Sequence, residues 1–182
     1  MTVNRYQRTL RLKDGSELRA RPIRPEDEDL LQDTFSQMSE RSVYFRFFSP
    51  LKRLPDSLAH KLSHVDYSDR FALVATGQAG HAGSDQRILG VARYDRAPGT
   101  EIAEVAVAVV DQYQRQGLGA GLLAALAQVA GEHGIKSFTL IVLPENQSMF
   151  KLLASMGWVH SSVFKHGVYE ITFPLEPDPP EA

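Results

Sequence analysis

The segment of this chain best suited to bind an anion is a pair of glycines preceded by a glutamine. Its spacing is Gln114-x-x-Gly117-x-Gly119-Ala120. At the start of a helix several backbone N–H groups lack intrahelical partners and the helix dipole is positive, so a phosphate can bind there without a lysine. Glycine has no Cβ atom, which lets the backbone approach such a group closely. The spacing is neither Gly-x-Gly-x-x-Gly nor Gly-x-x-x-x-Gly-Lys-Ser/Thr.

The same glycines are also compatible with a turn that only packs a helix tightly on a sheet. The order of the surrounding segments favours a phosphate site: an apolar run at 105–110, a turn at 111–113 and then a helix at about 117–133. The residues alone leave both interpretations open. A dinucleotide site is the weaker alternative, because Gly121 is not the third glycine of that motif and no acid follows about 20 residues later.

We call the segment Gln114 to Ala120 the glycine turn. Glu104 is the carboxylate best placed for acid–base chemistry, since it precedes the glycine turn within an apolar, central strand. Such a carboxylate can take a proton from a substrate, directly or through one water. The alternative is a solvated charge on a strand, and the residues alone do not decide between the two.

A second group that could do chemistry is the pair His60 and His64, which share one helix face at i, i+4. This is the spacing of the zinc ligands in His-Glu-x-x-His, but Lys61 stands in place of the glutamate and no third ligand is evident. No metal is therefore expected.

The composition bounds the function classes. With 182 residues, 43% hydrophobic and 23% charged, the chain suits one globular domain. A net charge of -2 argues against a general nucleic-acid or anionic-membrane surface. The chain has no cysteine, which excludes disulfides, a thiol nucleophile and an acyl-thioenzyme intermediate. The first residues show no apolar signal segment, so a cytoplasmic protein without a membrane span is expected.

Hydrophobic periodicity and turn residues predict the elements that position these groups. A hairpin is expected at the N-terminus, with its arginines on a solvated face. A β-α-β unit with two parallel strands is expected around the glycine turn. The predicted strands cover 9–13, 18–23, 70–76, 88–95, 102–110, 137–143, 158–164 and 167–173, and the predicted helices begin near 25, 39, 55, 117 and 146. A loop is predicted at 77–85, a single domain at 1–174 and a disordered tail at 175–182.

The glycine turn and this order of elements resemble the GNAT superfamily of N-acetyltransferases. A second family motif lies at 143–158, where an Asn opens a helix that ends in Gly-aromatic. The resemblance implies an α/β (α+β) fold with a mixed, mostly antiparallel sheet whose two parallel central strands splay apart. It also implies acetyl-CoA as acyl donor, with its pantetheine arm bound to the first parallel strand like an extra strand. The implied cofactor-binding residues are Val107, Val109, Gln114, Arg115, Gln116, Gly117, Leu118, Gly119, Ala120 and Asn146.

Within this superfamily, three segments look like bacterial protein lysine acetyltransferases: 103–106, Arg21 to Asp27 and Arg41 to Pro50. The resemblance implies Glu104 as general base, with a backbone N–H of Val107 or a neighbour for the oxyanion. It implies a protein lysine as acceptor, with an acyl-CoA synthetase as first candidate. Where many members have a tyrosine that protonates the leaving thiolate, this chain has Leu153. A small amine as acceptor, a non-catalytic acyl-CoA sensor and a homodimer stay open.

Overall fold

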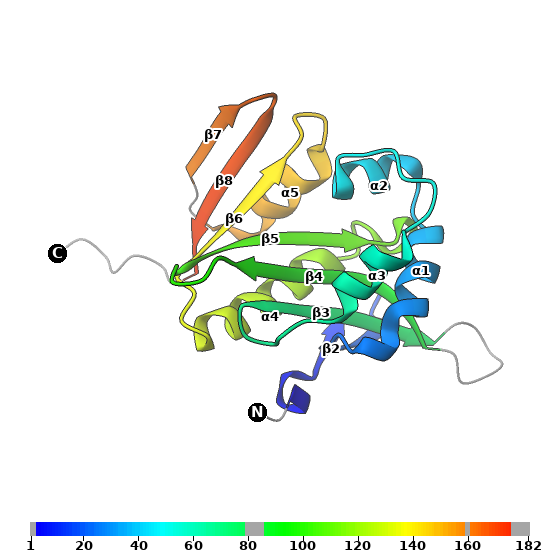
Figure 1. Cartoon of the computed structure of the whole chain (residues 1–182). Helices are drawn as coiled ribbons and strands as arrows, with labels where there is room; N and C mark the ends of the chain where they lie inside the picture. Colours follow the sequence, from blue (N-terminus) through cyan, green and yellow to red (C-terminus); the bar gives the residue numbers. More distant parts are fainter. Residues whose placement is uncertain (1–2, 79–85, 159–160, 176–182) are drawn as a thin grey trace.

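The computed structural model describes residues 3–78, 86–158 and 161–175 (Figure 1). Within these residues eight strands form one mixed sheet in the order β1-β2-β3-β4-β5-β6-β8-β7. All neighbouring strands are antiparallel except β5 and β6, which are parallel. The strands are β1 (Arg8–Arg11), β2 (Glu17–Pro22), β3 (Arg70–Gln78), β4 (Gln86–Arg96), β5 (Ile102–Val109), β6 (Ser137–Val142), β7 (Ser161–Lys165) and β8 (Val168–Pro174).

Helices cover both faces of the sheet. Two of them, α4 and α5, pack on one face, and α1, α2 and α3 lie over the other (Figure 1). The bounds are α1 (Glu28–Ser36), α2 (Glu40–Phe47), α3 (Asp56–Ser63), α4 (Leu118–Glu132) and α5 (Gln147–Met156), with single-turn 3-10 helices η1 (Val3–Tyr6), η2 (Pro25–Asp27) and η3 (Asp111–Tyr113). None of the helices among the described residues is long and apolar enough to cross a membrane.

Each face of the sheet has its own hydrophobic core. Under α4 and α5 the core includes Phe71, Tyr94, Leu122 and Phe138, all buried. Its largest contribution comes from α4, whose Ala and Leu residues favour a helix and turn a broad apolar face to the sheet. Under α1 to α3 a smaller cluster forms around Ile23. The sheet therefore sits between two packed layers, and its central strands are held from both sides.

The predicted elements are confirmed in type and order. The hairpin, the three N-terminal helices, the β-α-β unit and the two closing strands all form. Strand β3 extends through Gly77 and Gln78, which the sequence placed in the following loop. The rest of that predicted loop, 79–85, and residues 176–182 of the predicted tail lie outside the described residues. Leu175 donates its backbone N–H to the Lys136 carbonyl and packs on the core.

One prediction about the hairpin is wrong: Arg21 does not face solvent. It is buried, with 7% of its surface exposed, and it forms a bidentate ion pair with Asp27. Both of its terminal nitrogens lie 2.7 Å from an Asp27 carboxylate oxygen. Asp27 also accepts the backbone N–H of Arg24. The ion pair thus joins the two ends of the segment Arg21 to Asp27, which we call the closed turn and which connects β2 to α1.

Candidate active site

The parallel strands β5 and β6 pair over three residues only, and then separate. The last pair in register is Glu104 with Thr139, after Ile102 with Ser137 and Ala103 with Phe138. Figure 1 shows the two strands diverging from this point. We call the opening between β5 and β6 the splay, and the point where their pairing ends, at Glu104 and Thr139, its apex. Beyond Glu104, the edge of β5 that faces β6 has no strand partner among the described residues.

The orientation of the β5 backbone follows from one hydrogen bond. Val110 donates its N–H to Leu89, at the end of β4 nearest the glycine turn. Because N–H directions alternate along a strand, the N–H groups of Val107 and Val109 point the other way, toward the splay. A β-strand with free donors along one edge accepts an extended chain as an added strand. The splay therefore presents backbone groups to a ligand of extended shape.

The glycine turn lies at the far end of this open edge, where α4 begins. Gly117 is the N-cap of α4 and has a φ of 90°, so a side chain there would be strained and none is present to cap the helix. The first N–H groups of α4 consequently lack intrahelical partners. Arg115, also in the left-handed region at φ 61°, is exposed beside them. This end of α4 combines free donors, the positive end of the helix dipole and a cation.

Gly119 has a different role from Gly117. A Cβ atom on Gly119 would lie 2.7 Å from Leu152 of α5 and 3.7 Å from both Val107 and Val109. The absence of a side chain lets α4 approach α5 and β5 closely, as the tight-packing interpretation of the glycines expected. Tight packing thus accounts for Gly119 but not for Gly117, whose surroundings are open.

Hydrogen bonds hold the glycine turn to α2. The side-chain amide of Gln114 donates to Ser42 and to the Val109 carbonyl, 3.0 Å each. Asp111 accepts the backbone and side-chain donors of Ser39 and the hydroxyl of Ser42. Partial burial acts to raise the pKa of Asp111, but these hydrogen bonds outweigh it and lower the pKa. The N-terminus of α2 is therefore tied to the turn before α4 by side-chain hydrogen bonds.

Glu104 lies exposed where the strands part, among other charged groups on the α1–α3 face of the sheet. Asp95 of β4 is directly opposite Glu104 in register, and Arg93 Nε lies 3.4 Å from an Asp95 oxygen. Like charges opposite one another on a sheet repel, so the pair of acids needs nearby cations.

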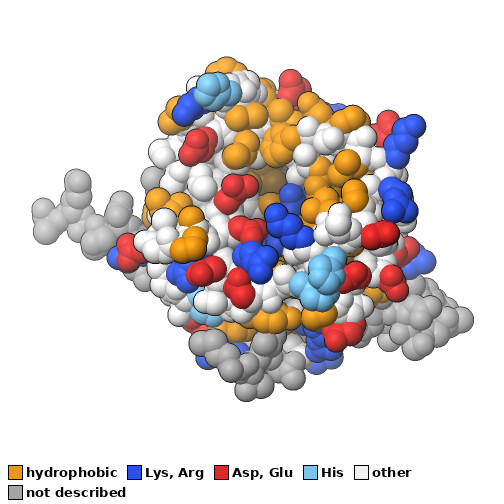
Figure 2. All heavy atoms as spheres, viewed as in Figure 1, with side chains coloured by type: hydrophobic (Ala, Val, Ile, Leu, Met, Phe, Trp, Pro, Cys, Tyr) orange, Lys and Arg blue, Asp and Glu red, His pale blue; other side chains and the backbone are white. Residues whose placement is uncertain are grey.

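Arg46 of α2 supplies the second cation of this cluster. It is half-buried, and its pKa falls to about 10 because of burial and of the positive charge of Arg93; Asp95 and Glu104 oppose the shift. Burial also lowers the pKa of Arg93. Figure 2 shows basic and acidic side chains gathered beside a hollow rimmed by hydrophobic atoms on this face. Two arginines and two acids thus surround the apex of the splay.

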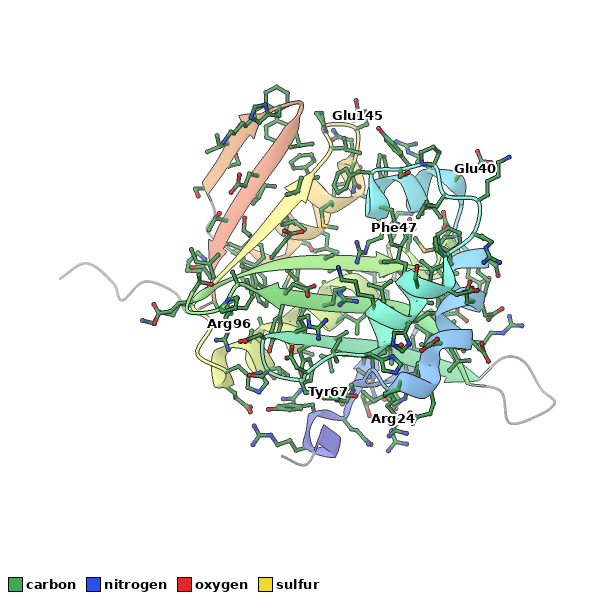
Figure 3. All side chains as sticks on the ribbon, in the orientation of Figure 1. Arg24, Glu40, Phe47, Tyr67, Arg96 and Glu145 are labelled. Carbon is green, nitrogen blue, oxygen red and sulfur yellow. The ribbon has the colours of Figure 1, made fainter. Side chains whose placement is uncertain are left out.

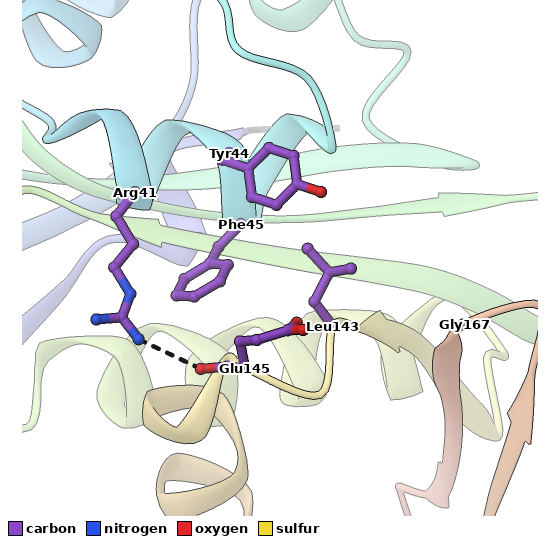
Figure 4. Close-up of a pocket in the computed structure, with 6 residues that line it drawn as sticks. All are labelled: Arg41, Tyr44, Phe45, Leu143, Glu145 and Gly167. Atoms are coloured by element: carbon purple, nitrogen blue, oxygen red, sulfur yellow. Dashed lines mark hydrogen bonds between the residues drawn. The ribbon is translucent and has the colours of Figure 1, made fainter.

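A cleft of about 410 Å³ opens between α2 and the loop that follows β6. Figure 4 shows Tyr44 and Phe45 reaching from α2 toward Leu143, with Arg41 bonded to the backbone of Glu145 (Nη2 to O, 3.5 Å). Phe47 of the same helix lies between α2 and the sheet instead (Figure 3) and lines a separate cavity of about 50 Å³.

Comparison with known proteins decides the family. The model of the acetyltransferase (GNAT) family matches residues 34–158, which include the splayed strands and the glycine turn. The chain belongs to the GNAT acetyltransferase family. An acetyltransferase of Pseudomonas aeruginosa is 30% identical over 148 residues, which are 81% of this chain and 78% of that protein. The chain is therefore an acetyltransferase of the GNAT type, and the fold expected from its motifs is confirmed.

Two further relatives are acetyltransferases called Pat. The GNAT domain of S. lividans PAT has a solved structure with a TM-score of 0.84 and 32% identity, covering 93% of this chain and 97% of that one. Acetyltransferase Pat of Mycolicibacterium smegmatis is 30% identical over 157 residues, 85% of this chain and 45% of that protein. A cAMP-binding acyltransferase from Mycobacterium smegmatis gives a TM-score of 0.63, with 48% of its chain covered. This chain thus spans about half the length of those two proteins.

Two residues singled out within the second GNAT motif have structural roles. Asn146 is the N-cap of α5, and its side-chain oxygen accepts the Met149 N–H at 3.2 Å. A cofactor contact of the Asn146 side chain would use its amide nitrogen or the second lone pair of its oxygen. Leu153 is buried in the core. The position that carries a tyrosine in many GNAT members is here filled by a packing residue.

Sequence reasoning missed Arg46, Arg93 and Asp95 as neighbours of Glu104. A signal was present in β4, where Arg93 and Asp95 occupy alternate positions of a central strand just after its apolar run at 88–92. Charges at i, i+2 on a strand that should be buried on both faces indicate a polar site. Arg46 had no such signal, because only the fold brings α2 over β5.

Proposed function

We propose that this GNAT acetyltransferase transfers the acetyl group of acetyl-CoA directly to the ε-amine of a protein lysine, with Glu104 as general base. The observation that carries the proposal is the splay, which leads from the free edge of β5 to Glu104 at its apex. An extended pantetheine arm fits that edge, and a thioester at its end would come close to the carboxylate. Acceptor and donor then react in one ternary complex.

Glu104 would remove the proton that makes the acceptor amine unreactive. At pH 7 a lysine with a pKa of ~10.4 is almost entirely protonated, a handicap of about 4–5 kcal/mol. Once Glu104 takes the proton, directly or through a water, the amine nitrogen bonds to the acyl carbon, the carbon–sulfur bond breaks and CoA leaves as a thiolate. The nitrogen gives its second excess proton to the departing thiolate or to water, which leaves a neutral amide. The backbone N–H of Val107, which points into the splay, would donate to the acyl oxygen as it gains negative charge.

The glycine turn and the start of α4 would hold the pyrophosphate of CoA. The donors there are the backbone N–H groups of Gln116 to Ala120, with Arg115 as the nearby cation. Gln114 serves differently, since its amide already bonds Ser42 and the Val109 carbonyl. We infer that Gln114 fixes the shape of the turn and that Val109 offers its N–H to the cofactor.

A protein lysine suits the cleft between α2 and the β6–α5 loop. Its aromatic wall, Tyr44 and Phe45, can cover the apolar stem of a lysine, and the exposed Glu145 carries the opposite charge of the ammonium. The segments Arg21 to Asp27 and Arg41 to Pro50, which resemble bacterial protein lysine acetyltransferases, support the same class of acceptor. An acyl-CoA synthetase remains the first candidate substrate.

Arg115→Glu is expected to weaken the binding of acetyl-CoA by about tenfold or more. A hydrogen bond to a charged group contributes about 1.5–3 kcal/mol, and the reversed charge adds repulsion toward a pyrophosphate. Because Arg115 is exposed, the substitution should leave the fold intact. Calorimetric titration of acetyl-CoA measures the change.

Lys52→Glu is the matched control, since it makes the same charge change at an exposed position outside the glycine turn. It should leave the affinity within about twofold of the unaltered chain, as expected for a distant, screened charge. Gly119→Glu is a poor test here, because its side chain would collide with Leu152. If Arg115→Glu and Lys52→Glu bind acetyl-CoA equally well, the pyrophosphate is bound elsewhere.

Labelled acetyl-CoA identifies the class of acceptor. The chain is incubated with a bacterial lysate, which is then separated into protein and small-molecule fractions. We expect label on protein lysines, and on purified acyl-CoA synthetase in a second reaction. Label found only among small molecules, with the synthetase unmodified, would instead make the chain a small-amine acetyltransferase. No transfer to any amine, with acetyl-CoA still bound, would favour the sensor module.

A further inference from the structure

A cluster of potential metal ligands lies on the surface that α1 and α3 share. Glu28 opens α1, and His60 and His64 lie at the end of α3. The carboxylate oxygen of Glu28 is 2.7 Å from His60 Nδ1 and 3.3 Å from His64 Nδ1. Figure 2 shows histidine atoms directly beside acidic ones on this face. The third ligand that sequence reasoning did not find therefore comes from another helix.

Packing of α1 against α3 creates this arrangement. The i, i+4 spacing places both imidazoles on one side of α3, where their rings stack with centroids 3.7 Å apart. A divalent ion bound by two neutral imidazoles and one carboxylate satisfies all three side chains.

The distances fit a tetrahedral site. Zinc bonds to nitrogen and oxygen are about 2.0–2.2 Å long, which places neighbouring ligand atoms about 3.3 Å apart. The candidate ligand atoms of the three residues all lie within 4.8 Å of one another. His60 is exposed and the other two side chains are partly so, which lets them adjust and leaves a fourth position to water.

His64 has a further contact that suits a ligand. Its Nδ1 lies 3.1 Å from the His60 carbonyl oxygen and 2.9 Å from the Ser63 hydroxyl. These contacts hold the ring beside Glu28, and on metal binding the deprotonated Nδ1 would exchange them for the ion. Imidazole with carboxylate selects zinc, copper or nickel over magnesium or calcium.

We propose that Glu28, His60 and His64 bind one divalent transition-metal ion, with Zn²⁺ as the representative, and that the ion joins α1 to α3. The site is separate from the glycine turn and from the splay. Its occupancy would stabilise the helical layer that covers the Glu104 face of the sheet, because a ligand that binds only the folded state stabilises it.

The test is a titration of the tag-free, chelator-treated chain with Zn²⁺ alone, followed by calorimetry and by the melting temperature. We expect one ion per chain and a rise in melting temperature. Co²⁺ in place of Zn²⁺ should give the visible absorption of a tetrahedral ion. Glu28→Gln and His60→Asn should each weaken binding by more than about tenfold, since even losing a hydrogen-bond partner of a ligand costs about that much.

His166→Asn, at the exposed turn between β7 and β8, is the matched control and should bind Zn²⁺ as the unaltered chain does. Melting without metal shows whether each variant folds, and Glu28→Gln serves if a histidine variant does not. The proposal is wrong if the unaltered chain shows no saturable Zn²⁺ binding. It is equally wrong if the double variant His60→Asn/His64→Asn keeps the same stoichiometry and affinity.

Discussion

Glu104→Gln is expected to lower turnover roughly 10²–10⁴-fold and to leave the affinity for acetyl-CoA unchanged, because the amide keeps the shape of the side chain but cannot accept the proton. The effect belongs in the transfer step, since the proposed cofactor contacts come from the backbone of β5 and the start of α4. Single-turnover kinetics with a lysine acceptor measure the rate, and calorimetry measures acetyl-CoA binding.

The rate of Glu104→Gln should recover in part as the pH rises. Below the pKa of lysine, each pH unit increases the fraction of free amine about tenfold, so the variant depends on pH more steeply than the unaltered enzyme. A loss caused by misfolding would not recover in this way. The pH profile thus separates a missing base from a damaged site.

Glu101→Gln provides the matched control for Glu104→Gln. Glu101 is exposed, lies just before β5 and pairs with Lys136 at 2.8 Å. Its removal changes the net charge equally but touches nothing in the splay, so turnover should stay within about twofold, in line with the small contribution of an exposed ion pair. Equal activity of Glu104→Gln and Glu101→Gln at pH 7 would remove Glu104 from the role of base.

Local patterns were sufficient to predict most of the fold. Alternation identified the hairpin, and helix signals such as Pro25 and the Ser39 cap located the first helices. The β-α-β unit followed from the apolar run, the glycine turn and the next apolar run. The splay, however, came from family resemblance, because no local pattern states where two parallel strands stop pairing.

The charged neighbours of the candidate site could not be predicted in the same way. Arg46 meets Arg93 and Glu104 only because α2 folds back over the sheet. Glu28 meets His60 across 32 positions of sequence. The burial of Arg21 depends on Asp27 being carried to it by a turn. In each case the partner belongs to a different element, and side-chain pairing between elements leaves no periodic trace in the sequence.

Arg21→Met is expected to lower the free energy of unfolding by about 3–5 kcal/mol, because it leaves the carboxylate of Asp27 buried without its cation. Asp27 has 3% of its surface exposed, and without Arg21 its one remaining described donor is the Arg24 N–H. A loss of this size is a large part of the 5–15 kcal/mol that is usual for a domain. Urea unfolding followed by circular dichroism measures it.

Arg11→Met is the control for Arg21→Met, since it breaks an ion pair of the same hairpin that is exposed. Arg11 and Glu17 lie 3.0 Å apart, with 76% and 52% of their side-chain surfaces exposed. Such pairs contribute about 0–1 kcal/mol. If both single variants lose the same free energy of unfolding, burial does not determine the effect of breaking the ion pair. In that case the closed turn from Arg21 to Asp27 does not anchor α1 to β2.

The double variant Arg21→Met/Asp27→Leu separates the charge from the packing. Replacing both members of a buried ion pair by apolar residues of similar volume is often neutral or stabilising, whereas removing one partner leaves an uncompensated charge. We therefore expect the double variant to regain most of the stability that Arg21→Met loses. Arg21 and Asp27 are the first and last residues of one of the segments that resemble lysine acetyltransferases. Full acetyl transfer by the folded double variant would show that the ion pair in this segment serves the stability of the fold. Loss of transfer in a stable double variant would instead indicate that the segment takes part in binding the acceptor.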